Sequence, residues 1–264
     1  MRKFLLFLVR NSLKTPSTKI GGYFNLLASK VIEILTSKYS MEDHSDLQKT
    51  IWTKGSKLWF SDEQPYDIDG KMKILWLELL KFPAISPFVF VDLGCGSGKL
   101  IANLAKFKSG NGKYVGLDMN LRFIHSDYHT LISQGTNLSF IQSDLRGLKN
   151  IEFSDETKTL IFTMFKFAKS LTPFELKELL NYLNDLSKNF EVFIAVQDVT
   201  LNNSSQQDKT LYFKEMRPGG MYWNHNWDNL TAQYGLVSIF KKDYISGSSL
   251  QINRILKYNS TIVV

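Results

Sequence analysis

The sequence predicts an α/β fold in which helices cover both faces of one doubly wound, largely parallel sheet. Three observations predict it. From about residue 85 short apolar runs alternate with amphipathic segments, three of these runs end in an aspartate, and the first leads into a cluster of glycines. Strands that alternate with helices are the order expected of such a sheet. A chain of 264 residues with 44% hydrophobic content can bury one domain of this kind and carry an extension.

Residues 1–70 are predicted to form a helical N-terminal extension, and residues 71–264 to form the α/β domain. Residues 23–35 and 72–80 have apolar side chains at helical spacing. The loop-like residues 59–66 lie between them, and the extension is a candidate lid or docking segment. The first apolar run is closed by an arginine and has no small-residue cleavage site, so a mature helix is favoured over a signal peptide. Residues 1–13 are a candidate for peripheral contact with a membrane.

The first predicted strand, residues 88–91, is β-branched and aromatic, as expected for a strand buried on both faces. It leads to Asp92 and then to Gly94, Gly96 and Gly98. Glycines let the backbone turn sharply and approach a ligand closely, and a helix can start directly behind such a turn, here at residues 99–106.

The spacing of these glycines separates the turn from two other nucleotide-binding loops. The dinucleotide fingerprint Gly-x-Gly-x-x-Gly would need a glycine where Lys99 stands. A P-loop needs Ser or Thr after Gly-Lys, and Leu100 stands there instead.

Two further predicted strands, residues 113–118 and 138–144, also end in aspartates. Asp118 follows Gly98 by 20 residues, about the distance that a strand–helix–strand unit needs to return to the same sheet edge. Ligands of open α/β sheets bind outside the carboxyl ends of the strands. For any one acid, a solvated loop residue or a helix N-cap is an equally good explanation. The occurrence of all three in register favours a shared ligand site.

Residues 92–98, Asp-Leu-Gly-Cys-Gly-Ser-Gly, resemble the first motif of class I S-adenosylmethionine-dependent methyltransferases. The resemblance covers about residues 70–258, with specific motifs only between residues 90 and 145. It implies S-adenosyl-L-methionine as cofactor and a seven-stranded sheet, with Asp118 at the ribose hydroxyls and Asp144 at the adenine amino group. The cofactor-binding residues that it implies are Asp92, Gly94, Cys95, Gly96, Ser97, Gly98, Asp118, Met119, Ser143, Asp144, Leu145 and Thr163.

The remaining elements are predicted in the order that this fold requires. Thr172 followed by Glu175 is the signature of a helix-capping box. The expected elements are a strand at 159–163, a helix at 173–185, a strand at 190–196, a polar insert at 197–226, a helix near 227–234, and a closing hairpin formed by 235–244 and 249–258.

The residues that bind the methyl acceptor and take its proton are expected in the polar insert. Residues 163–166 lack the Asp/Asn-Pro-Pro-Tyr/Phe motif of many amino methyltransferases and an acid suited to a metal-dependent catechol site, so no metal is expected. His225 is the predicted general base because its ordinary pKa suits proton removal near neutral pH. Asp198 and Tyr222 are the further catalytic candidates. An ordinary loop histidine and structural aromatic residues remain equally good explanations.

Cys95 is the only cysteine, which excludes an intramolecular disulfide and a cysteine-based zinc site. A reducing, cytoplasmic compartment is the default expectation. The position of Cys95 inside the glycine turn favours its small size, rather than nucleophilic chemistry, as the reason for its presence. No stretch reaches the 18 or so apolar residues that span a bilayer, so no transmembrane segment is expected.

Positive charge is concentrated near the N-terminus. Residues 1–60 hold 10 Lys/Arg and 4 Asp/Glu, whereas the rest of the chain holds 22 and 21. An acidic partner such as RNA, an anionic lipid surface or a phosphorylated or carboxylated substrate would explain this, and so would a solvated helical face.

We therefore predict a metal-independent methyltransferase that acts on an O or N atom of a small-molecule acceptor. Two alternatives remain open. One is an RNA or protein side-chain methyltransferase that docks through the basic N-terminal segment. The other is a non-catalytic scaffold that binds S-adenosylmethionine.

Overall fold

The structure, a computed structural model, describes residues 73–81, 87–107, 112–121, 124, 127–201, 210–211, 222–223, 225–246 and 249–259. The predicted N-terminal extension, including its lid and its membrane contact, lies outside these residues. The division of the chain at residue 70 therefore stays a prediction. The chain divides into two compact units: a larger one of Pro65–Ala168, Lys177–Asn202 and Asn226–Val264, and a smaller one of Met1–Gln64, Lys169–Leu176 and Asn203–His225.

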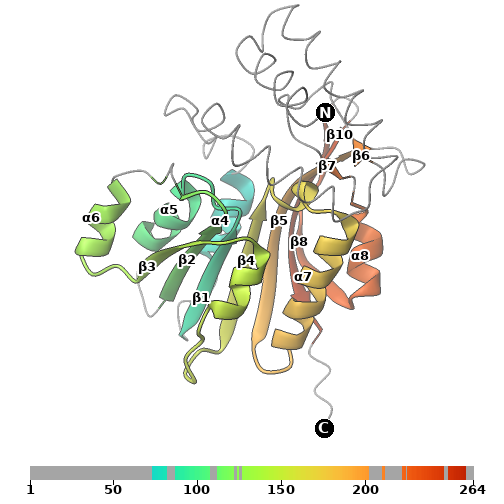
Figure 1. Cartoon of the computed structure of the whole chain (residues 1–264). Helices are drawn as coiled ribbons and strands as arrows, with labels where there is room; N and C mark the ends of the chain where they lie inside the picture. The colour runs from blue at the N-terminus through green and yellow to red at the C-terminus, as the bar shows by residue number, and fades with distance from the viewer. Residues whose placement is uncertain are drawn as a thin grey trace, which may run out of the picture. The chain divides into compact units, whose positions relative to one another are not determined.

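The larger unit is built on one mixed sheet whose main path has the strand order β3-β2-β1-β4-β5-β10-β8 (Figure 1). The first five strands of this path are parallel, and β10 runs antiparallel to both of its neighbours. A short strand, β9, pairs with β10 off this path, so the sheet has eight strands, one more than expected. The bounds are β1 Phe88–Leu93, β2 Gly112–Asp118, β3 Leu138–Gln142, β4 Thr159–Phe165, β5 Glu191–Leu201, β8 Leu236–Lys241, β9 Tyr244–Ser246 and β10 Ser249–Tyr258.

Helices cover both faces of this sheet, which confirms the doubly wound α/β prediction. In Figure 1, α4 (Lys73–Leu80) and α5 (Lys99–Phe107) lie on one face, and α7 (Pro173–Leu186) and α8 (Trp227–Gln233) lie on the other. The short helix α6 (Asp127–Ser133) precedes β3, and the 3₁₀ helices η3 (Leu145–Asn150) and η4 (Ala168–Ser170) follow β3 and β4. Among the described helices, none is long and apolar enough to cross a bilayer.

The core lies on both sides of the central strands because side chains alternate between the two faces of a strand. Every residue of β1 is buried, as predicted for a strand covered on both faces. On one face, the ring of Phe90 stacks on Tyr114 of β2 with centroids 5.8 Å apart, in a cluster that includes apolar side chains of α4 and α5. On the other face, the Tyr258 hydroxyl of β10 donates a hydrogen bond to the Leu180 carbonyl of α7 at 2.7 Å.

The predicted boundary that differs most from the structure is the end of β5. It runs to Leu201 instead of ending at Val196, so Asp198 lies on a strand and not in the polar insert. The parallel pairing of β5 with β4 reaches only Gln197. The antiparallel pairing with β10 continues to Leu201 and supplies the hydrogen bonds for the last residues of the strand.

The closing hairpin is also divided differently. The predicted strand at residues 235–244 is broken into β8 and β9 at Lys242 and Asp243. Asp243 accepts a hydrogen bond from the backbone N–H of Asn253 at 3.1 Å and another from the Arg254 guanidinium. The side chain of Asp243 therefore replaces regular strand pairing at this point.

Helix α7 begins at the predicted capping box. The backbone N–H of Glu175 donates to the Thr172 hydroxyl at 3.1 Å, and the backbone N–H of Thr172 donates to the Glu175 carboxylate at 3.0 Å. This reciprocal pair satisfies two N–H groups that have no partner within the helix.

Candidate active site

A turn between β1 and α5 holds the glycines that the sequence singled out. We call residues 94–98 the glycine turn. Gly94, Gly96 and Gly98 have positive φ angles of 67°, 55° and 73°, which glycine adopts without the steric strain of a side chain. The N–H of Gly98 donates to the Cys95 carbonyl at 2.8 Å, and the N–H of Ala102 donates to the Gly98 carbonyl at 3.0 Å. The helix α5 thus starts directly behind a sharp turn, as predicted.

Hydrogen bonds fix the glycine turn to the carboxyl end of β2. The N–H groups of Gly94 and Cys95 both donate to the Leu117 carbonyl, at 2.8 and 3.1 Å. The N–H of Gly96 donates to Oδ2 of Asp118 at 2.9 Å, and the N–H of Asn120 donates to Oδ1 at 2.9 Å. Each oxygen of a carboxylate has more than one acceptor site, so Asp118 can accept further hydrogen bonds from a ligand.

Asp118 is the last residue of β2, which is the position that the sequence pattern predicted. Burial raises the pKa of its carboxyl group, and the backbone donors around it, including those of Gly96 and Asn120, act in the opposite direction. The backbone donors orient the carboxylate and partly offset the loss of water around it.

Asp92 lies on β1 opposite Thr163 on β4, because the two strands pair in parallel with these residues in register. The carboxyl group is buried, and the Thr163 hydroxyl donates to its Oδ1 at 2.7 Å. Burial raises the pKa of Asp92 from 3.8 to about 7; the hydrogen bond from Thr163 opposes this rise, and the charge of Asp118 adds to it. Unlike an ordinary aspartate, Asp92 therefore holds a proton through part of the neutral pH range.

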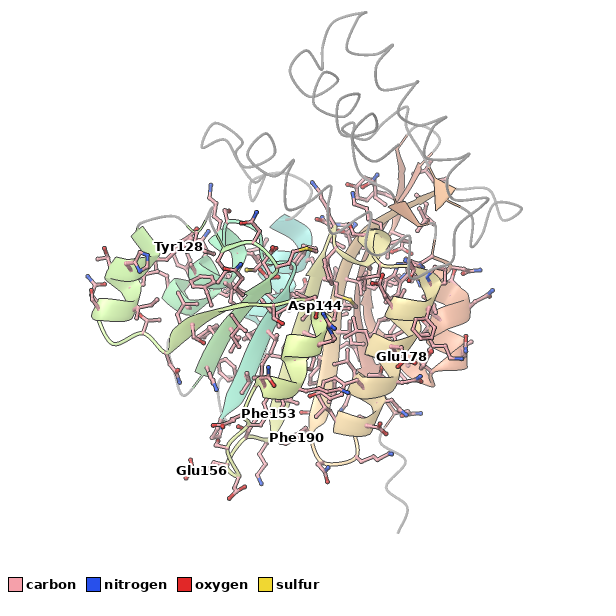
Figure 2. The ribbon with its side chains drawn as sticks, viewed as in Figure 1. Tyr128, Asp144, Phe153, Glu156, Glu178 and Phe190 are labelled. Atoms are coloured by element: carbon pink, nitrogen blue, oxygen red, sulfur yellow. The ribbon has the colours of Figure 1, made fainter. Side chains whose placement is uncertain are left out.

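Asp144 follows β3 and is the N-cap of η3; it is labelled in Figure 2. Its carboxylate accepts the backbone N–H of Arg146 at 3.0 Å and the guanidinium of the same residue at 2.7 to 3.0 Å. Next to it, the N–H of Ser143 donates to the Asp118 carbonyl at 3.0 Å and joins the ends of β3 and β2. The structure thus places Asp144 near the strand end predicted for it, with an arginine bound to the carboxylate.

The other predicted cofactor residues surround the same strand ends. Cys95 is buried, and burial raises the pKa of its thiol, with a further rise from the charges of Asp92 and Asp118. The thiol is therefore protonated and poorly nucleophilic at neutral pH, in agreement with a structural role. Ser97, Met119 and Leu145 are partly exposed at the ends of β1, β2 and β3.

The predicted general base, His225, is buried in the smaller unit. Its Nε2 lies 3.0 Å from the Leu171 carbonyl oxygen, which belongs to the same unit. A carbonyl oxygen only accepts hydrogen bonds, so Nε2 carries a hydrogen, and in the neutral ring Nδ1 is the nitrogen without a hydrogen. Any proton that His225 accepts must therefore go to Nδ1.

The other two catalytic candidates have different environments. Asp198 of β5 is fully buried, and its Oδ2 accepts a hydrogen bond from the indole Nε1–H of Trp227 at 3.1 Å. Tyr222 belongs to β7 (Tyr222–Trp223), which pairs with β6 (Thr210–Leu211), and its side chain lies outside the described residues. The catalytic roles of all three residues stay predictions.

Sequence reasoning missed two residues that organise the predicted acids, Asn120 and Arg146. Each lies two positions after an aspartate, which suits a backbone N–H that turns back to the preceding carboxylate. The Asp-x-Asn and Asp-x-Arg spacings in the sequence could therefore have predicted these two contacts.

Comparison with known proteins identifies the family. A family model described as a methyltransferase domain matches residues 86–263. A curated relative, the arsenite methyltransferase of Aquipseudomonas alcaligenes, is 27% identical over 154 residues, which are 56% of this chain and 43% of the relative. The chain thus spans less than half the length of that relative.

A solved structure with a similar fold is the 1,6-didemethyltoxoflavin-N1-methyltransferase of Burkholderia thailandensis, with bound 1,6-didemethyltoxoflavin and S-adenosylhomocysteine. The match has a TM-score of 0.51 at 10% identity and covers 84% of this chain and 92% of the other. At this identity the likeness supports the fold. The family match covers most of the chain, and the glycine turn and strand-end acids lie within it. The chain therefore belongs to the methyltransferase domain family, whose model matches residues 86–263, and this domain has the fold of class I methyltransferases.

Proposed function

We propose that this chain transfers the methyl group of S-adenosylmethionine to an O or N atom of a small-molecule acceptor without a metal ion. The observation that carries the proposal is the link between the glycine turn and Asp118. Three glycines with positive φ bring the backbone close to the carboxyl ends of β1 and β2, and the turn is hydrogen-bonded to the acid at the end of β2. Ligands of open α/β sheets bind at this edge.

The donor site is proposed to use the strand-end acids for different parts of the nucleoside. Asp118 would accept hydrogen bonds from the two ribose hydroxyls through the lone pairs that Gly96 and Asn120 leave open. Asp144 would accept from the adenine amino group while Arg146 holds the carboxylate in place. The cofactor supplies an activated methyl group on a positively charged sulfur, and the protein supplies orientation and exclusion of water.

The small-molecule acceptor is supported by two of the similar proteins, an arsenite methyltransferase and a 1,6-didemethyltoxoflavin-N1-methyltransferase. His225 is proposed as the general base, with Nδ1 as the atom that takes the proton from the acceptor. Asp198 and Tyr222 are the further candidates for this side of the reaction.

Thermal stability in the presence of ligand tests the donor site. S-adenosylhomocysteine and S-adenosylmethionine at about 100 times their Kd should each stabilise the fold by about 2.7 kcal/mol, and NAD should not. The Asp118→Ala variant should lose most of this shift. A matched control is Asp185→Ala, because Asp185 is an exposed carboxylate on α7 that pairs with Lys188. No shift with either sulfur nucleoside, or a shift with NAD alone, contradicts the proposal.

Transfer of labelled methyl groups tests the acceptor class. The protein is incubated with methyl-labelled S-adenosylmethionine and a cell extract that has been separated into small-molecule, RNA and protein fractions. Label in the small-molecule fraction is the expected result, and His225→Gln should reduce it without weakening S-adenosylhomocysteine binding. Label in RNA or protein supports the alternative acceptors. Binding of the nucleoside without any transfer supports a scaffold.

A further inference from the structure

Two aromatic rings occupy the space that side chains on the glycine turn and on β2 would need. A Cβ atom placed on Gly94 would clash with the ring of Phe167, whose Cγ would lie 2.8 Å away. Phe167 comes from the loop after β4, so this contact joins the end of β4 to the start of the glycine turn.

The second ring is that of Phe140 on β3. A Cβ atom on Gly98 would lie 2.5 Å from Cε1 of Phe140, and one on Gly116 of β2 would lie 2.6 Å from Cδ1 of the same ring. Phe140 is partly buried against the core, and its centroid is 6.1 Å from that of Tyr128, which is labelled in Figure 2. The glycine turn therefore has a phenyl ring close to its first glycine and another close to its last.

The position of Phe167 depends on an unusual backbone conformation. Lys166 has a φ of 55°, the one positive φ among the described non-glycine residues. A side chain in this region of φ is strained, so the surrounding structure must hold it there. The N–H of Lys166 donates to the Gln197 carbonyl of β5 at 2.7 Å, which anchors this bend. The bend directs the chain so that the next residue, Phe167, packs on Gly94.

We propose that Phe140 and Phe167 are positioning residues for the methyl donor. Packed against Gly94 at one end and Gly98 at the other, the two rings fix the glycine turn in the conformation that receives the nucleoside. Preorganisation of this kind raises affinity because binding no longer has to order the turn. The inference rests on the use of the glycine turn as the donor site, and it adds two residues that lie outside the motif.

The affinity for S-adenosylhomocysteine, measured by titration calorimetry on the full chain, tests the inference. Phe140→Leu and Phe167→Leu should each weaken binding about tenfold or more in protein that is folded by circular dichroism. The matched control is Phe153→Leu. Phe153 is part of another ring pair, with Phe190 at 5.5 Å between centroids, and both residues are labelled in Figure 2. This control should lose packing in the same way and keep its affinity within about twofold.

A double variant that enlarges one residue and shrinks its neighbour distinguishes a positioning role of Phe140 from a general role in packing. Gly116 lies in a strand and its φ is not positive, so alanine there is opposed by the Phe140 ring and by Sγ of Cys95 at 3.0 Å, and not by the backbone. Gly116→Ala should weaken binding, and the double variant Gly116→Ala/Phe140→Leu should recover part of the affinity that Gly116→Ala loses. If Phe140→Leu does not fold, Phe167→Leu and this double variant carry the test.

Two results overturn the inference: folded Phe140→Leu and Phe167→Leu proteins that bind S-adenosylhomocysteine within twofold of the wild type, or a double variant that binds no better than Gly116→Ala. Failure of the proposed function looks different, because the wild-type protein itself would then bind no S-adenosylhomocysteine.

Discussion

Aspartates in two regions of the larger unit are held by different kinds of partner. At the carboxyl ends of β1 and β2, Asp92 and Asp118 accept hydrogen bonds from neutral donors, namely the Thr163 hydroxyl and backbone N–H groups. At the antiparallel end, Asp228 of α8 and Asp243 accept from the guanidinium of Arg254, at 2.7 and 3.0 Å. The pKa of Asp92 and of Asp118 is raised by burial, whereas hydrogen bonding to Arg254 lowers the pKa of Asp228.

This difference indicates that the carboxyl ends of β1 and β2 are suited to binding a ligand, whereas the ion pairs around Arg254 stabilise the fold. Arg254, which is 2% exposed, and the half-exposed Lys241 together balance the charges of Asp228 and Asp243, so the antiparallel end is close to neutral. The acids beside the glycine turn have neutral partners, and we interpret the charge of Asp118 as suited to the cationic sulfonium nucleoside. Proteins tolerate such uncompensated groups mainly at functional sites.

The largest expected effect is at the antiparallel end. Arg254→Ala removes the cation from between Asp228 and Asp243 and takes away the guanidinium that pairs with the nearly buried carboxylate of Asp243. Breaking a buried ion pair in this way should cost about 3 to 5 kcal/mol of unfolding free energy, measured by urea denaturation. If the two regions are independent, folded Arg254→Ala protein should keep its affinity for S-adenosylhomocysteine. A loss below about 1 kcal/mol would show that the ion pairs do not hold this end together.

The second effect is a pH dependence from Asp92. Its folded-state pKa of about 7 lies above the usual 3.8, so the folded protein binds the proton more tightly than the unfolded chain does. Its contribution to stability is therefore complete below pH 3.8 and is lost as the pH rises through about 7. Between pH 5 and pH 8 the unfolding free energy should fall by about 2.5 kcal/mol from this group alone.

Asp92→Asn removes the titrating group and keeps the shape of the side chain. Denaturation of both proteins at several pH values isolates the contribution of Asp92, because the other groups titrate in both. Parallel pH profiles for the two proteins would show that Asp92 is ionised throughout this range.

A third, smaller effect is expected at Thr163. The Thr163→Val variant removes the hydroxyl that donates to Asp92 without changing the shape of the residue, and it should cost about 1 to 2 kcal/mol at pH 8. That hydrogen bond lowers the pKa of Asp92, so its loss should also move the pH-dependent fall in stability to higher pH. Thr159→Val on the same strand is a suitable control, because the Thr159 hydroxyl makes a long, exposed contact to Glu191 at 3.4 Å. Equal effects of the two variants would contradict a special role for the buried hydrogen bond.

The smallest effect is expected at Lys241, which lies beside the same carboxylates as Arg254 but is half exposed. Its ammonium is 3.3 Å from Asp228 and 3.8 Å from Asp243. Lys241→Ala should cost about 0.2 to 1 kcal/mol, and less in 1 M salt, because surface ion pairs are weak and screened. A cost similar to that of Arg254→Ala would mean that burial of the cation is not what gives the network its strength.

The glycine turn and its acids were predictable because local sequence determines them. The alternation of glycines requires positive φ, and strands that end in aspartate place those acids at one edge of a parallel sheet. The capping box before α7 was predictable for the same reason, since its two partners are three residues apart.

The contacts that the sequence did not predict join residues that are far apart in the chain. The hydrogen bond from Thr163 to Asp92 spans 71 residues, and the ion pair of Arg254 with Asp228 spans 26. Asp198 was predicted to lie in a polar insert because the sequence of β5 becomes polar at Gln197. Its burial depends on β10, which pairs with that stretch only after the chain has folded back. The rings of Phe140 and Phe167 likewise pack against glycines that lie on other elements, so the sequence near each ring does not predict the contact.

The strand β10 lies between β5 and β8 although it follows both of them in the sequence. While the polypeptide leaves the ribosome, one edge of β5 therefore stays open, and β8 has no strand of this sheet to pair with until residues 249–258 have been made. Pairings such as Gln197 with Asn253, 56 residues apart, also form slowly compared with local contacts. Open strand edges attract other chains. A newly made molecule is therefore open to aggregation through these strand edges until β10 is inserted.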